Sequence, residues 1–112
     1  MMLRKMTLGR TGMEVTQLGY GAALRWTPDE DRVERVLNAV LDAGINFIDT
    51  SWCYPSSEEL IGRYIGHRRS EYSISTKLCF KKYFGKENIT CTVIARYHKN
   101  FIEVKTGWPK KG

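Results

Sequence analysis

Three side chains among the first 77 residues could together transfer a proton: a carboxylate, a phenol and an ammonium, on Asp49, Tyr54 and Lys77. A free phenol has a pKa of about 10, too high to exchange a proton readily at neutral pH. A nearby ammonium makes a phenol more acidic, and a carboxylate paired with that ammonium keeps it charged and in place. Such a phenol can protonate a carbonyl oxygen while hydride reaches the carbon. The alternative is that Asp49 caps a loop, Tyr54 packs and Lys77 is a solvated strand end.

The elements that must position these residues follow from the hydrophobic pattern. Residues 45–49 read as a short, mostly apolar strand and residues 72–77 as a further strand, so Asp49 and Lys77 each lie at the C-terminal end of a strand. A further strand is predicted over residues 18–22. Helical patterns separate these strands, and such alternation favours an α/β fold with a parallel sheet. In a β/α barrel, the C-terminal ends of the strands form the rim on which active sites are built.

Two helices are predicted between these strands. The first has Thr27 as N-cap and Pro28 at its first helical position, and Gly44 ends it. Its apolar stripe comprises Val33, Val36, Leu37, Val40 and Leu41. The second helix begins with a capping box formed by Ser56 and Glu59. Its apolar face comprises Leu60, Ile61, Tyr64 and Ile65.

Segments before and after this region give weaker signals. Residues 3–8 and 13–18 flank a Gly-bounded turn and predict a β-hairpin. After Lys77, the sequence predicts a helix start over 84–89, strand character over 91–95 and 101–104, and a frayed end over 108–112.

Bulk composition is that of a small soluble domain. The chain has 112 residues, 42% hydrophobic and 27% charged, and its apolar runs are too short to span a bilayer. The N-terminus lacks the apolar run of a secretory signal. Three cysteines without a C-x-x-C pair argue against a disulfide framework or a zinc site, so we expect no metal and a cytoplasmic location.

The net charge of +6 is confined to the C-terminal part of the chain. Residues 1–77 contain 10 Lys+Arg and 10 Asp+Glu, whereas residues 78–112 contain 8 and 2. The preferred base also changes from Arg to Lys near Leu78. We therefore divide the chain into residues 1–77, an ordered α/β part, and residues 78–112, a divergent, poorly ordered basic tail. A displaced reading frame, a retained intron or a faulty gene model would explain the change. Specific nucleic-acid binding is not expected from it.

Several ordered motifs in residues 1–77 resemble the aldo-keto reductase family. Residues 44–58, GINFIDTSWCYPSSE, resemble the signature G-x-N-x-x-D-T-A-x-x-Y-G-x-S-E. Residues 7–15 resemble the family's opening hairpin, residues 18–22 its first strand, and Ser75-Thr76-Lys77 the strand that ends on the catalytic lysine.

This resemblance implies part of a (β/α)8 TIM barrel, with the hairpin and about three βα units, and an NADPH-dependent reduction of small aldehydes and ketones. It implies that Tyr54 is the proton donor, that Lys77 is the cation that acidifies it, and that Asp49 supports Lys77 beside the nicotinamide. It also places Gly21, Ala22 and Ala23 near the cofactor.

Departures from the family pattern predict that the chain alone is inactive. Pro55 replaces the usual Gly after the tyrosine and restricts the backbone of Tyr54. The family's fourth catalytic residue, a His after the fourth strand, does not follow residues 101–104, and His98 precedes them. The C-terminal half of the cofactor site is missing. Two alternatives remain: a non-catalytic fragment that pairs with another barrel chain or self-associates through open sheet edges, and a small basic polyanion-binding protein.

Overall fold

A five-stranded sheet forms the centre of the computed structural model, which describes residues 2–24, 29–79, 89–98 and 101–111. The strand order is β3 (Tyr20–Gly21), β4 (Phe47–Asp49), β5 (Ser73–Cys79), β6 (Ile89–His98) and β7 (Phe101–Lys111). β3, β4 and β5 are parallel, whereas β6 and β7 each run antiparallel to the preceding strand. The parallel α/β part that the sequence predicts is therefore present, and the described strands do not close into a barrel.

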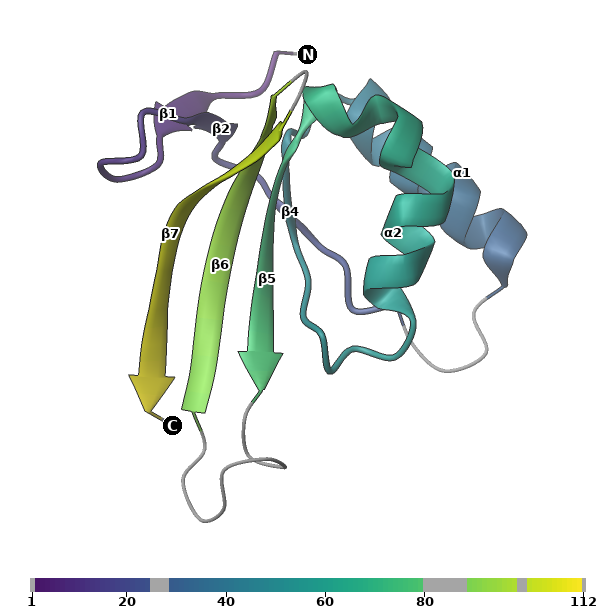
Figure 1. Ribbon diagram of the computed structural model, residues 1–112. Coiled ribbons are helices and arrows are strands. Elements are labelled where there is room, and N and C mark those ends of the chain that lie inside the picture. Colours follow the sequence, from purple (N-terminus) through teal and green to yellow (C-terminus); the bar gives the residue numbers. More distant parts are fainter. Residues whose placement is uncertain (1, 25–28, 80–88, 99–100, 112) are drawn as a thin grey trace.

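Two helices connect the parallel strands. α1 (Glu30–Asp42) lies between β3 and β4 in the sequence, and α2 (Ser57–Ile65) lies between β4 and β5, followed by the 3₁₀ helix η1 (Gly66–Glu71). Figure 1 shows both helices beside β4 and β5, with β6 and β7 extending the sheet away from them. No helix in the described part of the chain is long and apolar enough to cross a membrane.

The ends of α1 differ in how well the sequence predicted them. The helix begins at Glu30, and its N-cap is Asp29, whose side chain accepts a hydrogen bond from the backbone N–H of Arg32. The prediction of Thr27 as N-cap is therefore wrong, because Asp29 takes that position. Thr27 itself and the predicted first helical residue Pro28 lie outside the described residues. The predicted C-terminal end is confirmed. Gly44 follows the helix with a φ of +92°, a left-handed conformation that favours glycine.

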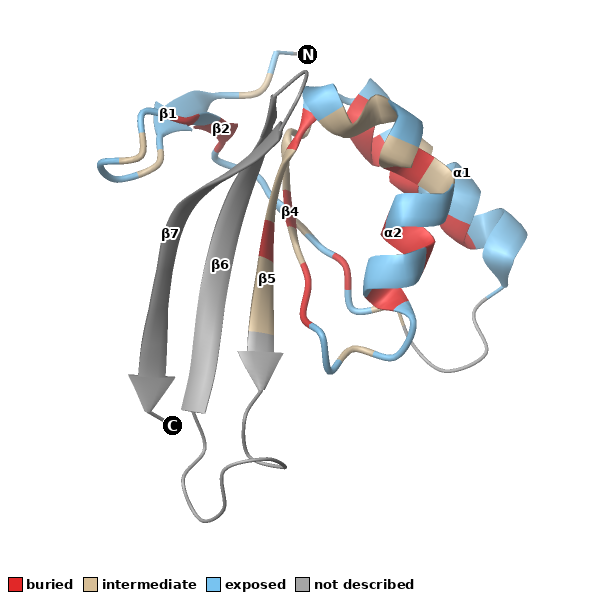
Figure 2. Cartoon of the chain, viewed as in Figure 1, coloured by how far each residue is buried: buried red, intermediate tan, exposed pale blue. Residues whose placement is uncertain are grey.

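Within the described residues, an apolar core joins the two helices to the sheet. Most of the predicted stripe residues are buried in it, but Val36 is 38% exposed. Figure 2 shows the buried residues on the sides of α1 and α2 that face the strands. The core cluster consists of Ala22, Val33, Leu37, Leu41, Ile48, Leu60, Ile61, Ile65 and Tyr72. Burial of these side chains is the main force that fixes α1 and α2 on β3, β4 and β5.

The predicted capping box of α2 is not formed. Ser56 occupies the N-cap position, but its φ of 60° is left-handed and its side chain makes no capping hydrogen bond. A side-chain cap requires an extended N-cap residue. The neighbouring Ser57 is fully buried instead, and its hydroxyl bonds both the N–H and the carbonyl oxygen of Leu24 at 2.9 and 3.0 Å. Ser57 thus ties the start of α2 to the segment that follows β3.

The predicted hairpin is confirmed as β1 (Lys5–Thr7) paired with β2 (Glu14–Thr16). It is attached to the sheet through Asn46, just before β4. The Asn46 amide accepts from the N–H of Thr16 at 2.7 Å and donates to the carbonyl of Glu14 at 3.0 Å. The asparagine of the signature segment therefore has a structural role in this chain.

The C-terminal segments differ most from expectation. The strand character predicted over 91–95 and 101–104 is confirmed, but both strands are longer and belong to an antiparallel pair. Residues 108–111, predicted as frayed, continue β7. Of the helix start predicted over 84–89, residues 84–88 lie outside the described residues, and Ile89 begins β6.

Candidate active site

The ammonium of Lys77 is held by three oxygen atoms at the C-terminal ends of β4 and β5. It lies 2.9 and 3.0 Å from the two carboxylate oxygens of Asp49 and 2.8 Å from the carbonyl oxygen of Thr50. The side chains of Lys77 and Asp49 are 25% and 42% exposed. An ammonium has three donors and no acceptor, so these contacts fix its position while solvent still reaches the pair.

The parallel register brings these residues together. Asp49 lies level with Gly21 on β3 and Ser75 on β5, two residues before Lys77. Backbone hydrogen bonds continue beyond the end of β4, because the N–H of Thr50 donates to Ser75 at 2.7 Å and that of Trp52 donates to Lys77 at 3.0 Å. The loop after β4 is thus fixed to β5 on the same rim as the ion pair.

Tyr54 is positioned by a turn in that loop. Its N–H donates to the carbonyl of Ser51, and its carbonyl accepts from the N–H of Ser57 at the start of α2. Its half-buried ring lies beside Lys77, with 5.6 Å between Nζ and the ring centroid. Pro55 therefore does not remove the phenol from the neighbourhood of the cation. All three residues singled out from the sequence lie at one site.

The residues proposed to approach a cofactor are placed less uniformly. Ala22 is fully buried in the core, and its backbone bonds Asp49 and Thr50. Gly21 and Ala23 are exposed. Among the described residues, no atom would lie within 4 Å of a Cβ at Gly21, which is level with Asp49. Gly21, Ala22 and Ala23 carry no charged side chain.

The position of His98 excludes it from this rim. β6 runs opposite to β5, and Ala95 pairs with Ile74 near the start of β5. His98 follows three residues later and ends β6, so it lies toward the opposite end of the strands from Lys77. The strand beside β5 therefore delivers its C-terminal residue to the wrong end for the family's fourth catalytic position.

Two contributors to the site were not predicted as functional from the sequence. The carbonyl oxygen of Thr50 completes the contacts of Lys77, and the hydroxyl of Ser57 anchors the loop that carries Tyr54. A backbone carbonyl has no signature in the residue pattern. Ser57 is visible as the serine of the signature segment, but only the structure shows that its hydroxyl bonds the backbone of Leu24.

The sequence was also compared with those of known proteins. The aldo/keto reductase family model matches residues 16–104, which is most of the chain. The chain is 41% identical over 78 residues to the "Probable voltage-gated potassium channel subunit beta" of Oryza sativa, covering 63% of this chain and 24% of that protein. It is 35% identical over 88 residues to the "Putative aryl-alcohol dehydrogenase" of Schizosaccharomyces pombe, covering 69% and 24%.

Among solved structures, the chain resembles the holo form of an aldo-keto reductase from Bacillus halodurans. The TM-score is 0.64 and the identity 31%, over 70% of this chain and 26% of that one. The protein belongs to the aldo-keto reductase family, and its fold is part of that family's barrel. The chain spans about a quarter of the length of each of these three relatives. The family match also runs across the composition change near Leu78.

Proposed function

We propose that this chain carries the proton-donating centre of an NADPH-dependent reductase of small aldehydes and ketones, and that it is inactive alone. The observation that supports this most directly is the geometry of the rim. Lys77 contacts both carboxylate oxygens of Asp49 and lies beside the ring of Tyr54. Family membership supports the reaction class, because oxidoreductases are among its relatives.

Each residue has a distinct role in the proposed chemistry. Tyr54 donates its phenolic proton to the carbonyl oxygen of the substrate, as a general acid. Lys77 stabilises the phenolate that remains, because its positive charge lies beside the ring. Asp49 acts through Lys77 and keeps the ammonium on the rim. The exposed surface at Gly21 and Ala23 receives the nicotinamide, and bound NADPH supplies the hydride.

The proposed inactivity rests on what the rim lacks among the described residues. His98 lies toward the end of the strands opposite to Lys77. Gly21, Ala22 and Ala23 carry no charged side chain for the cofactor phosphates. We place the protein in the cytoplasm, where NADPH is available and the exposed thiol of Cys53 stays reduced.

A chimera tests whether this rim is chemically competent. Residues 1–77 would replace the matching N-terminal quarter of an active, full-length aldo-keto reductase, and NADPH-dependent reduction of an aromatic aldehyde would be followed. We expect turnover by the chimera and none by the 112-residue chain. Tyr54→Phe should lower kcat of the chimera about 10²- to 10⁴-fold, the usual contribution of a positioned general acid.

Tyr64→Phe in α2 provides the matched control, because it removes a phenol from a half-buried position outside the rim. It should leave kcat unchanged. A chimera that folds and binds NADPH but shows no turnover would contradict the assignment of this rim. Turnover by the 112-residue chain alone would contradict its proposed inactivity.

A further inference from the structure

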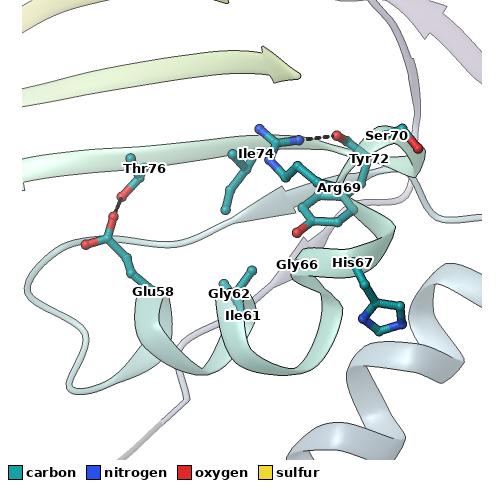
Figure 3. Close-up of a pocket in the computed structure, with 10 residues that line it drawn as sticks. All are labelled: Glu58, Ile61, Gly62, Gly66, His67, Arg69, Ser70, Tyr72, Ile74 and Thr76. Carbon is teal, nitrogen blue, oxygen red and sulfur yellow. Dashed lines mark hydrogen bonds between the residues drawn. The ribbon is translucent and has the colours of Figure 1, made fainter. Parts of the chain in front are cut away.

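Thr76 and Lys77 are neighbours on β5, and their side chains leave opposite faces of the sheet because side chains alternate along a strand. The ammonium of Lys77 bonds Asp49 on the rim. The hydroxyl of Thr76 instead donates to the carboxylate of Glu58, in the first turn of α2, at 2.9 Å. Figure 3 shows this hydrogen bond between α2 and β5. The C-terminal part of β5 is therefore held from both of its faces.

Glu58 lies only four residues after the proposed proton donor. The turn that follows Tyr54 is closed by a hydrogen bond from the N–H of Ser57 to the Tyr54 carbonyl at 3.2 Å. Ser57 is fully buried, and its hydroxyl is bonded to the segment that follows β3. Glu58 comes next, so its carboxylate leaves a fixed point of α2. Its bond to Thr76 thus connects the segment that carries Tyr54 to β5.

A backbone hydrogen bond connects the same two segments on the other side of the tyrosine. The N–H of Trp52 donates to the carbonyl oxygen of Lys77 at 3.0 Å. Trp52 and Glu58 therefore bracket Tyr54 in the sequence, and both are bonded to consecutive residues of β5. The distance of 5.6 Å between the Nζ of Lys77 and the ring centroid of Tyr54 is set between these two links.

We infer that Glu58 and Thr76 are positioning residues, which hold the phenol of Tyr54 at its working distance from Lys77. Their hydrogen bond lies on the helix-covered side of β5 and acts through the loop and the strand. A misplacement of about 1 Å in a catalytic group can lower a rate about 10²-fold, so a single link at this point affects catalysis. The inference rests on the proposed role of Tyr54 as general acid.

The first measurement follows amide hydrogen exchange in the full 112-residue chain by NMR. Thr76→Val removes the hydroxyl and keeps the branched shape that strands favour. We expect exchange of the Trp52 N–H to become about fivefold faster, the factor that one lost hydrogen bond represents, while the amides of α1 keep their protection. Thr76→Ser retains the hydroxyl and should keep the slow exchange, although serine is not branched. Unchanged exchange at Trp52 in Thr76→Val would overturn the inference.

Variants of Glu58 test the same link from its other end. Glu58→Ala removes the acceptor and should accelerate exchange at Trp52 as Thr76→Val does. Glu58→Gln retains an oxygen acceptor and should preserve the protection. Glu59→Ala is the matched control, because Glu59 lies in the same turn of α2 but pairs with Arg63. Equal acceleration by Glu59→Ala would assign the effect to charge at the start of the helix and would overturn the inference.

Catalysis is measured in the chimera that carries residues 1–77. Thr76→Val should lower kcat about tenfold and leave the KM for NADPH and for the aldehyde within about twofold, as expected for a group whose effect is confined to the transition state. Thr76→Ser should keep kcat near that of the unmodified chimera. If Tyr54→Phe lowers kcat and Thr76→Val does not, the inference fails and the proposed function stands. If Tyr54→Phe leaves kcat unchanged, the proposed function fails and the inference fails with it.

Discussion

The parallel and antiparallel parts of the sheet organise their residues in different ways. β3, β4 and β5 run in one direction and are connected by α1 and α2, so their C-terminal ends meet on one rim. β6 and β7 reverse direction twice, and among the described residues no helix lies between β5 and β7. Only the strands of the parallel part place successive C-terminal residues side by side.

This difference explains why the three proposed site residues converge, whereas His98, the last residue of β6, lies at the other end of the strands. The positions of Asp49 and Lys77 on the rim follow from strand direction alone, and the position of Tyr54 follows from the loop that leaves β4. In the antiparallel part, Thr92 of β6 lies level with Lys77, and β6 ends with His98 at the other end of the strands. β7 returns to the rim, but it is separated from β5 by β6.

The largest expected effect comes from weakening the parallel part at its core. Leu37 of α1 is fully buried between the helices and the sheet. Leu37→Ala should lower the free energy of unfolding by about 2–5 kcal/mol, through lost burial and the cavity that remains. Urea denaturation measures this change directly. Val36→Ala, at an exposed position on the same helix, should cost about 0.5 kcal/mol. Equal losses of unfolding free energy for both variants would mean that the buried face of α1 does not stabilise the core.

A smaller and local effect is expected from breaking the antiparallel part. Val93 of β6 pairs with Thr76 on β5 and Gly107 on β7. Val93→Pro removes a backbone donor from a central strand, at a cost of about 1–3 kcal/mol. Hydrogen exchange should accelerate in β6 and β7 while α1 and β4 remain protected. Val93→Thr keeps the donor and the branched side chain and serves as control. Simultaneous loss of protection in α1 would show that the two parts unfold as one unit.

Local signals predicted the parallel part better than the antiparallel part. The apolar stripe and Gly44 located α1 because both depend only on neighbouring residues. The capping box at Ser56 failed because a left-handed backbone prevents its side chain from reaching the helix. Strand character over 91–95 and 101–104 was predicted from the sequence, but the direction of those strands was not. Direction is set by pairing with residues far away in the sequence, such as Ile74 with Ala95.

The smallest expected effect comes from protonating carboxylates. The two parts differ in these groups, with 10 in residues 1–77 and 2 in residues 78–112. Glu71, at the end of η1, accepts two hydrogen bonds from Arg68 at 2.8 Å, and these hold the pKa of its carboxyl below the usual range. Arg68 also pairs with Asp42 at the end of α1, so this cluster fastens α1 to the segment before β5.

Because the folded-state pKa of Glu71 is lowered, its stabilising contribution is complete above the unfolded-state pKa of about 4.3 and is lost as the pH falls through the folded-state value. Glu71→Gln should therefore reduce stability slightly at neutral pH, and its difference from the wild type should vanish in acid. Urea denaturation between about pH 3 and 7 measures this difference. Since most carboxylates lie in residues 1–77, hydrogen exchange in acid should accelerate in α1 and β4 before β6 and β7. The reverse order would mean that the antiparallel strands depend on charges outside this cluster.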